Sequence, residues 1–183
     1  MREWGFVLLL ALAGCATSDP RAEAPNVFRD ASAGFEVTKP ADWHWFEAER
    51  GGRKVLVAFS KYVEPYDDLN PSFEVVVEPT STLEGKGVLV ALRTMLEAQR
   101  RELGGRVETE PRLIDVAGKQ AAYARLDYDA VLPDGRTLPV AVETWVVPAG
   151  QRVFFLDAGT RPDEKTGSRD EIEAIVRSVR ITP

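Results

Sequence analysis

Residues 122–146, AYARLDYDAVLPDGRTLPVAVETWV, decide the fold of this 183-residue chain. From Ala122 to Ala130, small and apolar residues alternate with mostly polar ones, which is the period of a β-strand. Asp134-Gly135 is among the strongest short hairpin signals, and a second strand-like run extends from Leu138 to Val146. The stretch therefore predicts a long antiparallel hairpin. Pro139 lies within the second strand, so it must occupy a position that needs no amide donor.

Strand patterns on both sides extend this hairpin into a larger sheet. Residues 107–114 precede it, and residues 151–158 follow it behind the Ala149-Gly150 turn. Closer to the N-terminus, a Gly51-Gly52 turn separates two further strand-like runs. The predicted strands of this N-terminal part cover residues 26–28, 34–38, 43–46, 54–60 and 73–78.

Two stretches have the period of a helix instead. In residues 86–103 the apolar side chains recur on one face, and Gly104-Gly105 follows as a stop signal. The second helix begins at Ser168 with a capping box, in which the Ser168 hydroxyl and the Glu171 carboxylate each accept the other residue's amide. Strands joined as hairpins, with one helix midway and one at the end, predict the α+β class with a mainly antiparallel sheet.

Three local stretches resemble the PsbP-like superfamily, which includes the photosystem extrinsic protein and the Ran-binding Mog protein. The first is Gly34-Phe35-Glu36-Val37, followed by a Pro-x-x-Trp turn at residues 40–43. The second is residues 118–126, similar to the Gly-x-x-Ala entry of a long central hairpin. The third is residues 172–181, which resemble the final helix of the family, although Val179 stands where the family often has phenylalanine.

The resemblance covers residues 26–183 as one domain and implies a particular architecture. It implies an α/β/α sandwich around a central, mainly antiparallel sheet with two main helices. Members of the superfamily act by binding proteins, and the resemblance carries no catalytic residue to this chain. A binding role is therefore an expectation drawn by analogy, because a fold does not determine a function.

The N-terminal residues have the order of a bacterial lipoprotein signal. Arg2 supplies a positive charge, and residues 6–12 form an apolar run too short to span a bilayer. Leu12-Ala13-Gly14-Cys15 resembles the lipobox, in which the cysteine receives diacylglycerol and fatty acids such as palmitate. We therefore predict a signal peptide over residues 1–14 and a lipid anchor on the cysteine. The alternative is a chance cysteine in an uncleaved apolar segment.

Residues 15–25 connect the predicted anchor to the domain. From Ala16 to Pro25 no aliphatic side chain is larger than alanine, which predicts a flexible tether with a root-mean-square reach of roughly 17 Å. Ala16 stands where an aspartate would retain a lipoprotein of enteric bacteria in the inner membrane. The expected location is therefore the outer membrane, with the domain facing the periplasm.

Composition narrows the classes of function. The net charge of -6 includes no basic block, which argues against nucleic acid as a partner. Cys15 is the one cysteine, so a disulfide within the chain is excluded. His44 is the one histidine, which argues against Ser-His-Asp, Cys-His and multi-histidine zinc sites. We expect no enzyme activity, no metal and no cofactor.

Aromatic and acidic residues give the candidate binding sites. The loop from Glu64 to Asp68 contains Asp67 and Asp68, and Tyr62 and Tyr66 are nearby. Trp145 shares a strand face with a glutamate, which favours an exposed aromatic. The loop has carboxylates for a weak calcium site but lacks the EF-hand order, so a solvated acidic loop is the simpler interpretation.

Two further stretches contain candidate binding or catalytic residues. Trp43 and Trp45 are expected to fill the core, with His44 on the opposite face of their strand. Asp127 and Asp129 lie across the hairpin from a glutamate, as a glycoside hydrolase requires, although such acids more often pair with a neighbour such as Arg125.

The sequence as a whole favours a membrane-anchored periplasmic lipoprotein. In this interpretation its domain is a non-enzymatic accessory module that binds another protein of the cell envelope. Three alternatives remain open: a small-ligand carrier, a carboxylate-dependent hydrolase and a calcium-stabilised module.

Overall fold

The hairpin predicted from residues 122–146 lies in the main sheet. Strands β9 (Lys119–Val131) and β10 (Thr137–Ala149) pair antiparallel in the register Thr137↔Val131 to Val146↔Ala122. Gly135 has a φ of 83° in the connecting turn, a left-handed conformation that glycine adopts without strain. Pro139 lies beyond Ala141, the outermost residue of β10 that pairs with the following strand, so the missing amide disrupts no ladder on that side.

The computed structural model describes residues 26–50, 53–62, 69–132, 134–163 and 168–182. In these residues the hairpin belongs to a seven-stranded antiparallel sheet with the order β3-β6-β7-β11-β10-β9-β8. Its other strands are β3 (Trp43–Trp45), β6 (Val57–Lys61), β7 (Ser72–Pro79), β8 (Arg106–Val116) and β11 (Arg152–Thr160). The prediction of an α+β fold with a central, mainly antiparallel sheet is confirmed.

Two smaller sheets accompany the central one. The first has the order β1-β2-β12 and consists of β1 (Val27–Asp30), β2 (Phe35–Thr38) and β12 (Arg180–Ile181). The second is a hairpin of β4 (Glu49–Arg50) and β5 (Arg53–Lys54). The single strand predicted over residues 54–60 is therefore wrong in detail, because the chain leaves β5 at Lys54 and enters β6 at Val57.

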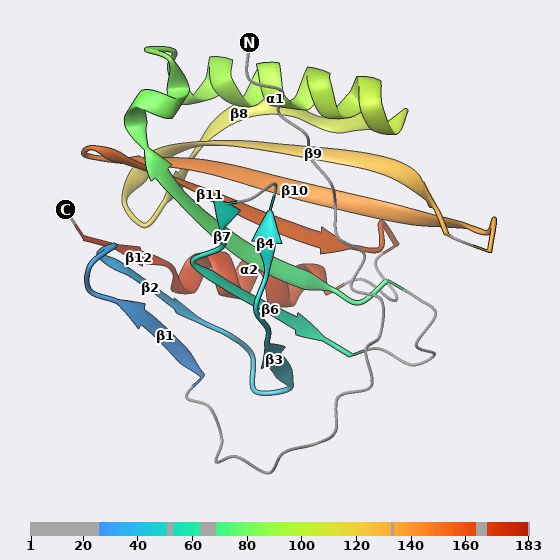
Figure 1. Ribbon diagram of the computed structural model, residues 1–183, viewed down its shortest axis with the longest axis horizontal. Coiled ribbons are helices and arrows are strands. Elements are labelled where there is room, and N and C mark those ends of the chain that lie inside the picture. Colours follow the sequence, from blue (N-terminus) through green and yellow to red (C-terminus); the bar gives the residue numbers. More distant parts are fainter. Residues whose placement is uncertain (1–25, 51–52, 63–68, 133, 164–167, 183) are drawn as a thin grey trace.

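Helix α1 (Val88–Leu103) covers one face of the central sheet (Figure 1). It begins after the short 3-10 helix η1 (Thr80–Leu83) and ends as predicted, with Gly104 in the left-handed conformation. Its buried face packs against small side chains of β9 such as Ala122 and Ala124. The buried residues of α1 are Leu92, Met95, Leu96 and Gln99.

Helix α2 (Arg169–Ser178) and the sheet β1-β2-β12 cover the opposite face (Figure 1). Ile172 and Ile175 of α2 belong to the same core as Phe154 and Leu156 of the central sheet. The two largest hydrophobic cores therefore lie on opposite sides of one sheet. This is the three-layered α/β/α arrangement that the family resemblance implies.

The predicted capping box at the start of α2 is wrong. The Ser168 side chain makes no capping hydrogen bond. The Glu171 carboxylate instead accepts hydrogen bonds from Nζ of Lys61 at 3.1 and 3.3 Å, and Asp42 binds the same Nζ at 3.0 Å. Because Lys61 lies on β6, this ion pair joins α2 to the central sheet. A tertiary partner has replaced the local one.

Candidate functional site

Trp145 is buried, so the expectation of an exposed aromatic at this position is wrong. Only 4% of the residue is exposed, and its ring lies 5.2 Å from the ring of Tyr123 in the core beneath α2. Because β10 is covered on both faces, its neighbour Thr144 is buried as well. Trp145 therefore stabilises the core and is unavailable to a partner.

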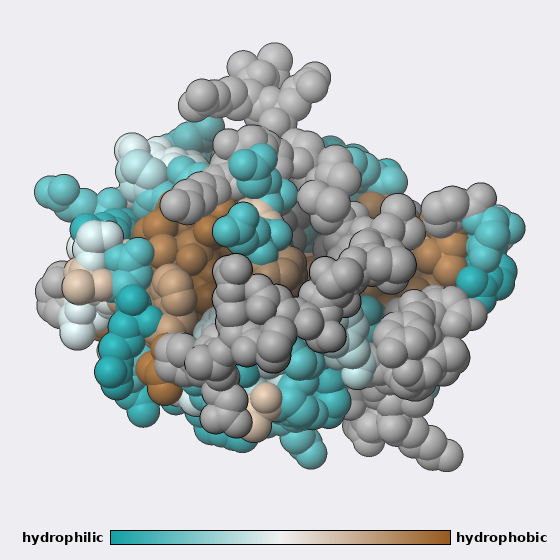
Figure 2. All heavy atoms as spheres, turned by 60° about the horizontal axis from the view of Figure 1, so that its bottom comes forward, coloured by the Kyte–Doolittle hydropathy of each residue, from teal (hydrophilic) through white to brown (hydrophobic). Residues whose placement is uncertain are grey.

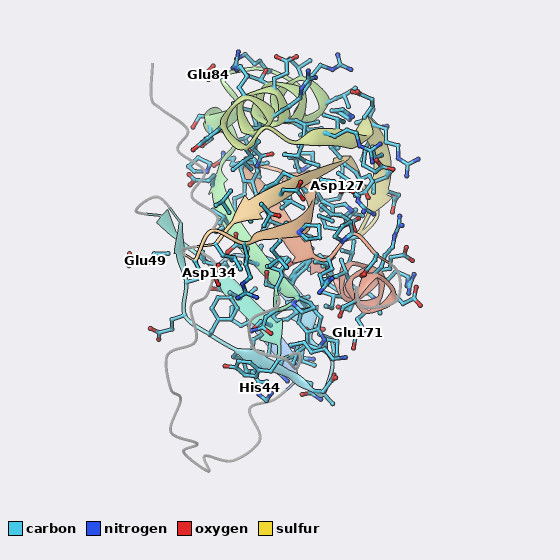
Figure 3. All side chains as sticks on the ribbon, turned by 90° about the vertical axis from the view of Figure 1, so that its right-hand side faces the viewer. His44, Glu49, Glu84, Asp127, Asp134 and Glu171 are labelled. Atoms are coloured by element: carbon cyan, nitrogen blue, oxygen red, sulfur yellow. The ribbon has the colours of Figure 1, made fainter. Side chains whose placement is uncertain are left out.

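The remaining predicted aromatic and acidic residues divide into two groups. Tyr62 is 55% exposed and lies against His44, with 5.2 Å between the ring centroids. Tyr66, Asp67 and Asp68 lie outside the described residues, as does the predicted lipidation site. Tyr62 and His44 thus form an exposed aromatic pair at the β3 edge of the sheet (Figure 3 labels His44).

The strand containing His44 follows the predicted alternation. Trp43 is fully buried, His44 is exposed and Trp45 is half-buried. Trp43 and Trp45 pack against Phe59 with ring centroids 5.8 and 5.2 Å apart. The prediction that the two tryptophans face the core is confirmed.

The acids of the central hairpin are bonded to neighbouring side chains. The Arg125 guanidinium donates two hydrogen bonds to the Asp127 carboxylate, at 2.8 and 3.1 Å. The Tyr123 hydroxyl donates a buried hydrogen bond of 2.5 Å to Glu143. Figure 3 shows Asp127 on the sheet, between the layers of the two helices.

Burial and these hydrogen bonds change the pKa values of Tyr123 and Arg125, as expected for a structural network. Burial, reinforced by the bond to Glu143, raises the pKa of the Tyr123 hydroxyl above its ordinary range. The hydrogen bond to Asp127 raises the pKa of Arg125. Neither of the two cavities described below is lined by Asp127 or Glu143. The arrangement favours a buried polar network rather than the converging acids of a hydrolase.

A groove lies where the β1-β2 layer meets the central sheet. Its volume is about 680 Å³, which is within the range of 300–1,000 Å³ that is usual for binding sites. The floor is apolar and comes from three separate parts of the chain: Phe28 and Ala33 of β1 and its turn, Leu56, and Val77. In Figure 2, which brings the side of β1 and β3 forward, hydrophobic residues gather in a hollow bordered by hydrophilic ones.

Charged and polar side chains surround this floor. Asp30, Ser32, Glu78 and Arg152 complete the lining of the groove. The Asp30 carboxylate accepts hydrogen bonds from the Ser32 hydroxyl at 2.6 Å and from the Ala33 amide at 2.9 Å. These two bonds are the main reason that the pKa of Asp30 is lowered. Asp30 is therefore occupied by its own turn.

Arg152 differs from the acid beside it. Within the described part of the chain its guanidinium forms neither a hydrogen bond nor an ion pair, and it acts on Asp30 only as a nearby charge. The side chain is exposed, at the start of β11. The groove thus combines an apolar floor with a positive charge that is available to an anionic group.

A second cavity lies between α1 and η1. Its volume is about 90 Å³, and its lining is mostly apolar, with Met95 and Phe155 at its base. Lys86 and Glu84, which form an ion pair of 3.0 Å, also line it. This cavity is far smaller than a typical ligand site.

The described residues contain no cluster of three or more histidine, cysteine, aspartate or glutamate side chains that could hold a metal ion. None of the described helices has the length and hydrophobicity needed to cross a membrane.

Sequence reasoning missed the groove. Phe28, Leu56 and Val77 are apolar residues of the kind that is common in any β-strand. Arg152 follows a turn, where an exposed arginine is common and does not indicate a binding site. These four residues meet only because the β1-β2 layer ends over this part of the central sheet. No local pattern in the sequence carries that information.

Solved structures resemble this chain, although neither a comparison with family models nor one with curated protein sequences gives a match. Cyanobacterial PsbP, called CyanoP, from Synechocystis aligns with a TM-score of 0.58 at 17% identity, over 93% of this chain and 99% of CyanoP. The chain has a PsbP-like fold. The resemblance drawn from the sequence is thereby confirmed for the fold.

Two further structures share this PsbP-like fold. LpqN, which is involved in cell envelope biogenesis of Mycobacterium tuberculosis, aligns with a TM-score of 0.51 at 18% identity, over 81% of this chain and 83% of LpqN. A protein from Bacteroides thetaiotaomicron aligns with a TM-score of 0.52 at 16% identity, over 87% of this chain. This chain spans 49% of that protein, about half its length.

Proposed function

We propose that this chain is a non-enzymatic accessory protein of the bacterial cell envelope that binds another envelope protein through the groove beside β1. The observation that carries the proposal is the groove itself, because it joins an apolar floor to the guanidinium of Arg152, which has no ion pair within the described part of the chain. An apolar centre with a charged rim is the usual composition of a protein-binding surface.

Two further observations support a binding role. The hairpin acids Asp127 and Glu143 are each bonded to a neighbouring side chain, which is how structural carboxylates are held. The PsbP-like fold is shared with LpqN, an envelope-biogenesis protein. We extend the proposal to a lipid anchor on Cys15 and to the periplasmic face of the outer membrane, on the basis of the lipobox-like sequence.

The small cavity between α1 and η1 supports the alternative of a small-ligand carrier less well than the groove supports protein binding. Its 90 Å³ would accommodate one small apolar group, whereas carriers usually enclose most of a larger ligand. Protein binding through the groove is therefore the better-supported function.

The experiment is in-cell crosslinking of the full chain, followed by affinity capture and mass spectrometry. The matched control is Cys15→Ala, which removes the proposed anchor and leaves the domain unchanged. We expect the unaltered chain in the membrane fraction with one dominant envelope protein attached, and Cys15→Ala in the soluble fraction with that capture lost. If both forms fractionate alike and capture nothing, the proposal is wrong.

A further inference from the structure

The groove is bordered by a strand edge that can accept another strand. The layer on this face of the central sheet has the order β1-β2-β12, so β1 is its outermost strand. No other strand in the described ranges pairs with the free edge of β1. An unpaired edge presents backbone donors and acceptors to any extended chain that approaches it.

The register shows which backbone groups point outward. The Lys39 amide donates to the Asn26 carbonyl at 2.8 Å, so these residues form a hydrogen-bonded pair. Hydrogen-bonded and non-bonded pairs alternate in an antiparallel ladder, so Phe28↔Val37 is also a bonded pair. The amides and carbonyls of Val27 and Arg29 must therefore point away from β2.

The side chains of β1 point alternately into the groove and to the other face of the strand. Phe28 and Asp30 line the groove, whereas Arg29 lies on the other face and forms an ion pair of 2.6 Å with Glu36. A strand added beside Val27 and Arg29 would therefore have alternate side chains directed to the apolar floor. This is the arrangement by which peptides extend an exposed sheet edge.

The charges of the groove select the kind of strand. Of the two acids in the lining, Asp30 is occupied by the turn that it stabilises, and Glu78 also has a partner. Arg152 is the cation of the lining, and it has no ion pair among the described residues. A guanidinium binds a carboxylate with two parallel hydrogen bonds. An acidic residue on the incoming strand therefore complements the groove.

We propose that the groove binds an extended segment of the partner protein, which adds as a strand to the free edge of β1, places apolar side chains on Phe28 and Leu56, and binds Arg152 through a carboxylate. This inference rests on the proposed function, since it specifies the partner for the same groove. It excludes a globular surface that touches only side chains.

The test uses the purified full chain and a synthetic peptide array. The probes are short peptides of alternating leucine and threonine in which one aspartate occupies each position in turn, with asparagine twins. Binding is measured by fluorescence anisotropy. We expect aspartate peptides to bind about two- to fivefold more tightly than their twins, because this is the affinity that an ion pair with an exposed arginine contributes.

Four variants test separately the ion pair with Arg152 and the addition of a strand to β1. Arg152→Glu should remove the preference for aspartate, whereas Arg93→Glu, the same charge change on the exposed side of α1, should bind as the unaltered chain does. Arg29→Pro removes an outward amide that β2 does not use, and it should abolish binding. Arg29→Ala keeps that amide and should retain binding. Circular dichroism establishes that each variant is folded.

The outcomes distinguish this inference from the proposed function. Absent peptide binding, equal binding of aspartate and asparagine peptides, or full binding by Arg29→Pro would each overturn the strand-addition inference. In-cell capture that persists in Arg152→Glu and Arg29→Pro would also overturn it, while the envelope role would stand. Peptide binding without in-cell capture would support the groove and contradict the tethered role.

Discussion

Trp145 contributes to the core rather than to a surface. Its ring packs beside Tyr123 in the same cluster as Ile172 and Ile175 of α2. A buried aromatic side chain of this size removes a large apolar area from water, and its loss leaves a cavity that the surroundings fill only in part.

We predict that Trp145→Ala lowers the free energy of unfolding by about 3–5 kcal/mol. Tyr62→Ala is the matched control on an exposed aromatic, and it should change stability by no more than about 0.5 kcal/mol. Urea denaturation followed by circular dichroism measures both. Equal effects of the two substitutions would contradict the structure of β10.

Lys39 is a buried cation that has no carboxylate partner at hydrogen-bond distance among the residues that the structure describes. The residue is 5% exposed, and its Nζ donates to Oδ1 of Asn26 at 3.0 Å and to the Pro40 carbonyl at 3.3 Å. The same Nζ lies 5.5 Å from the centroid of the Trp45 ring. Burial lowers the pKa of this ammonium below its usual value of 10.5, although the charge of Asp42 acts in the opposite direction.

This lowered pKa predicts a pH dependence with a definite sign. Between the folded pKa of Lys39 and 10.5, the unfolded chain binds more protons than the folded one, so the stability contributed by this group rises with pH. We expect the stability of Lys39→Met, relative to the unaltered chain, to decrease as the pH rises from neutrality toward 10.5. Urea denaturation across that range measures it, and a constant difference would contradict the inference of a depressed pKa.

At the scale of elements, Gly34 joins the β1-β2 turn to β12. Its φ is 63°, and a Cβ atom there would lie 2.7 Å from the Thr182 carbonyl oxygen. The Thr182 amide donates to the Gly34 carbonyl at 2.8 Å. The turn and the C-terminal residues therefore approach too closely for any side chain at this position.

We predict that Gly34→Ala is more destabilising than Gly135→Ala. Both glycines have positive φ, but a Cβ atom at Gly135 meets nothing within 4 Å. The control should therefore cost only the backbone term of about 1 kcal/mol, and Gly34→Ala about 1–3 kcal/mol more through overpacking. Ending the chain at Ile181 should remove this excess. Thermal or urea denaturation of Gly34→Ala and Gly135→Ala, each in the full-length and in the shortened chain, would show it.

The elements that sequence predicts well are those whose signal is local. The hairpin over residues 122–146 and the helix that ends before Gly104 are defined by periodicity and by their own turn residues. The exposure of Trp145 was not predictable in the same way, because alternation shows which residues share a face but not whether a second layer covers that face.

Contacts between residues far apart in the sequence account for the other differences between the predictions from sequence and the structure. The Glu171 carboxylate binds Lys61, which is 110 residues away, rather than its local capping partner. The groove brings Arg152 together with Phe28 and Leu56 from the other end of the domain. Such pairs depend on how the layers stack, and no sequence window contains both members.

At the scale of the whole molecule, one sheet connects two cores. The tryptophans of the described residues, Trp43, Trp45 and Trp145, all lie on the α2 side, whereas Leu92 lies in the core beneath α1. Tryptophan fluorescence from these residues therefore reports on one side only, while circular dichroism reports on the entire fold.

We predict that Leu92→Ala lowers the urea midpoint by the same amount in both signals, because the central sheet makes the two cores unfold as one unit. The substitution should cost about 2–5 kcal/mol. A fluorescence transition that stays in place while the circular dichroism transition moves would show that the cores unfold separately. Ile175→Ala, on the α2 side, is the matched comparison.

The position of β1 also determines how the molecule responds to force. The proposed tether joins the domain at Asn26, directly before β1, and β1 is held to β2 by a ladder of only four residue pairs. Tension on a lipid anchor would therefore load this short ladder before it reached the two cores. Because β1 also forms the edge of the groove, a pull on the tether would act first on the binding surface, and the strand in contact with the partner would be the first to bear the load.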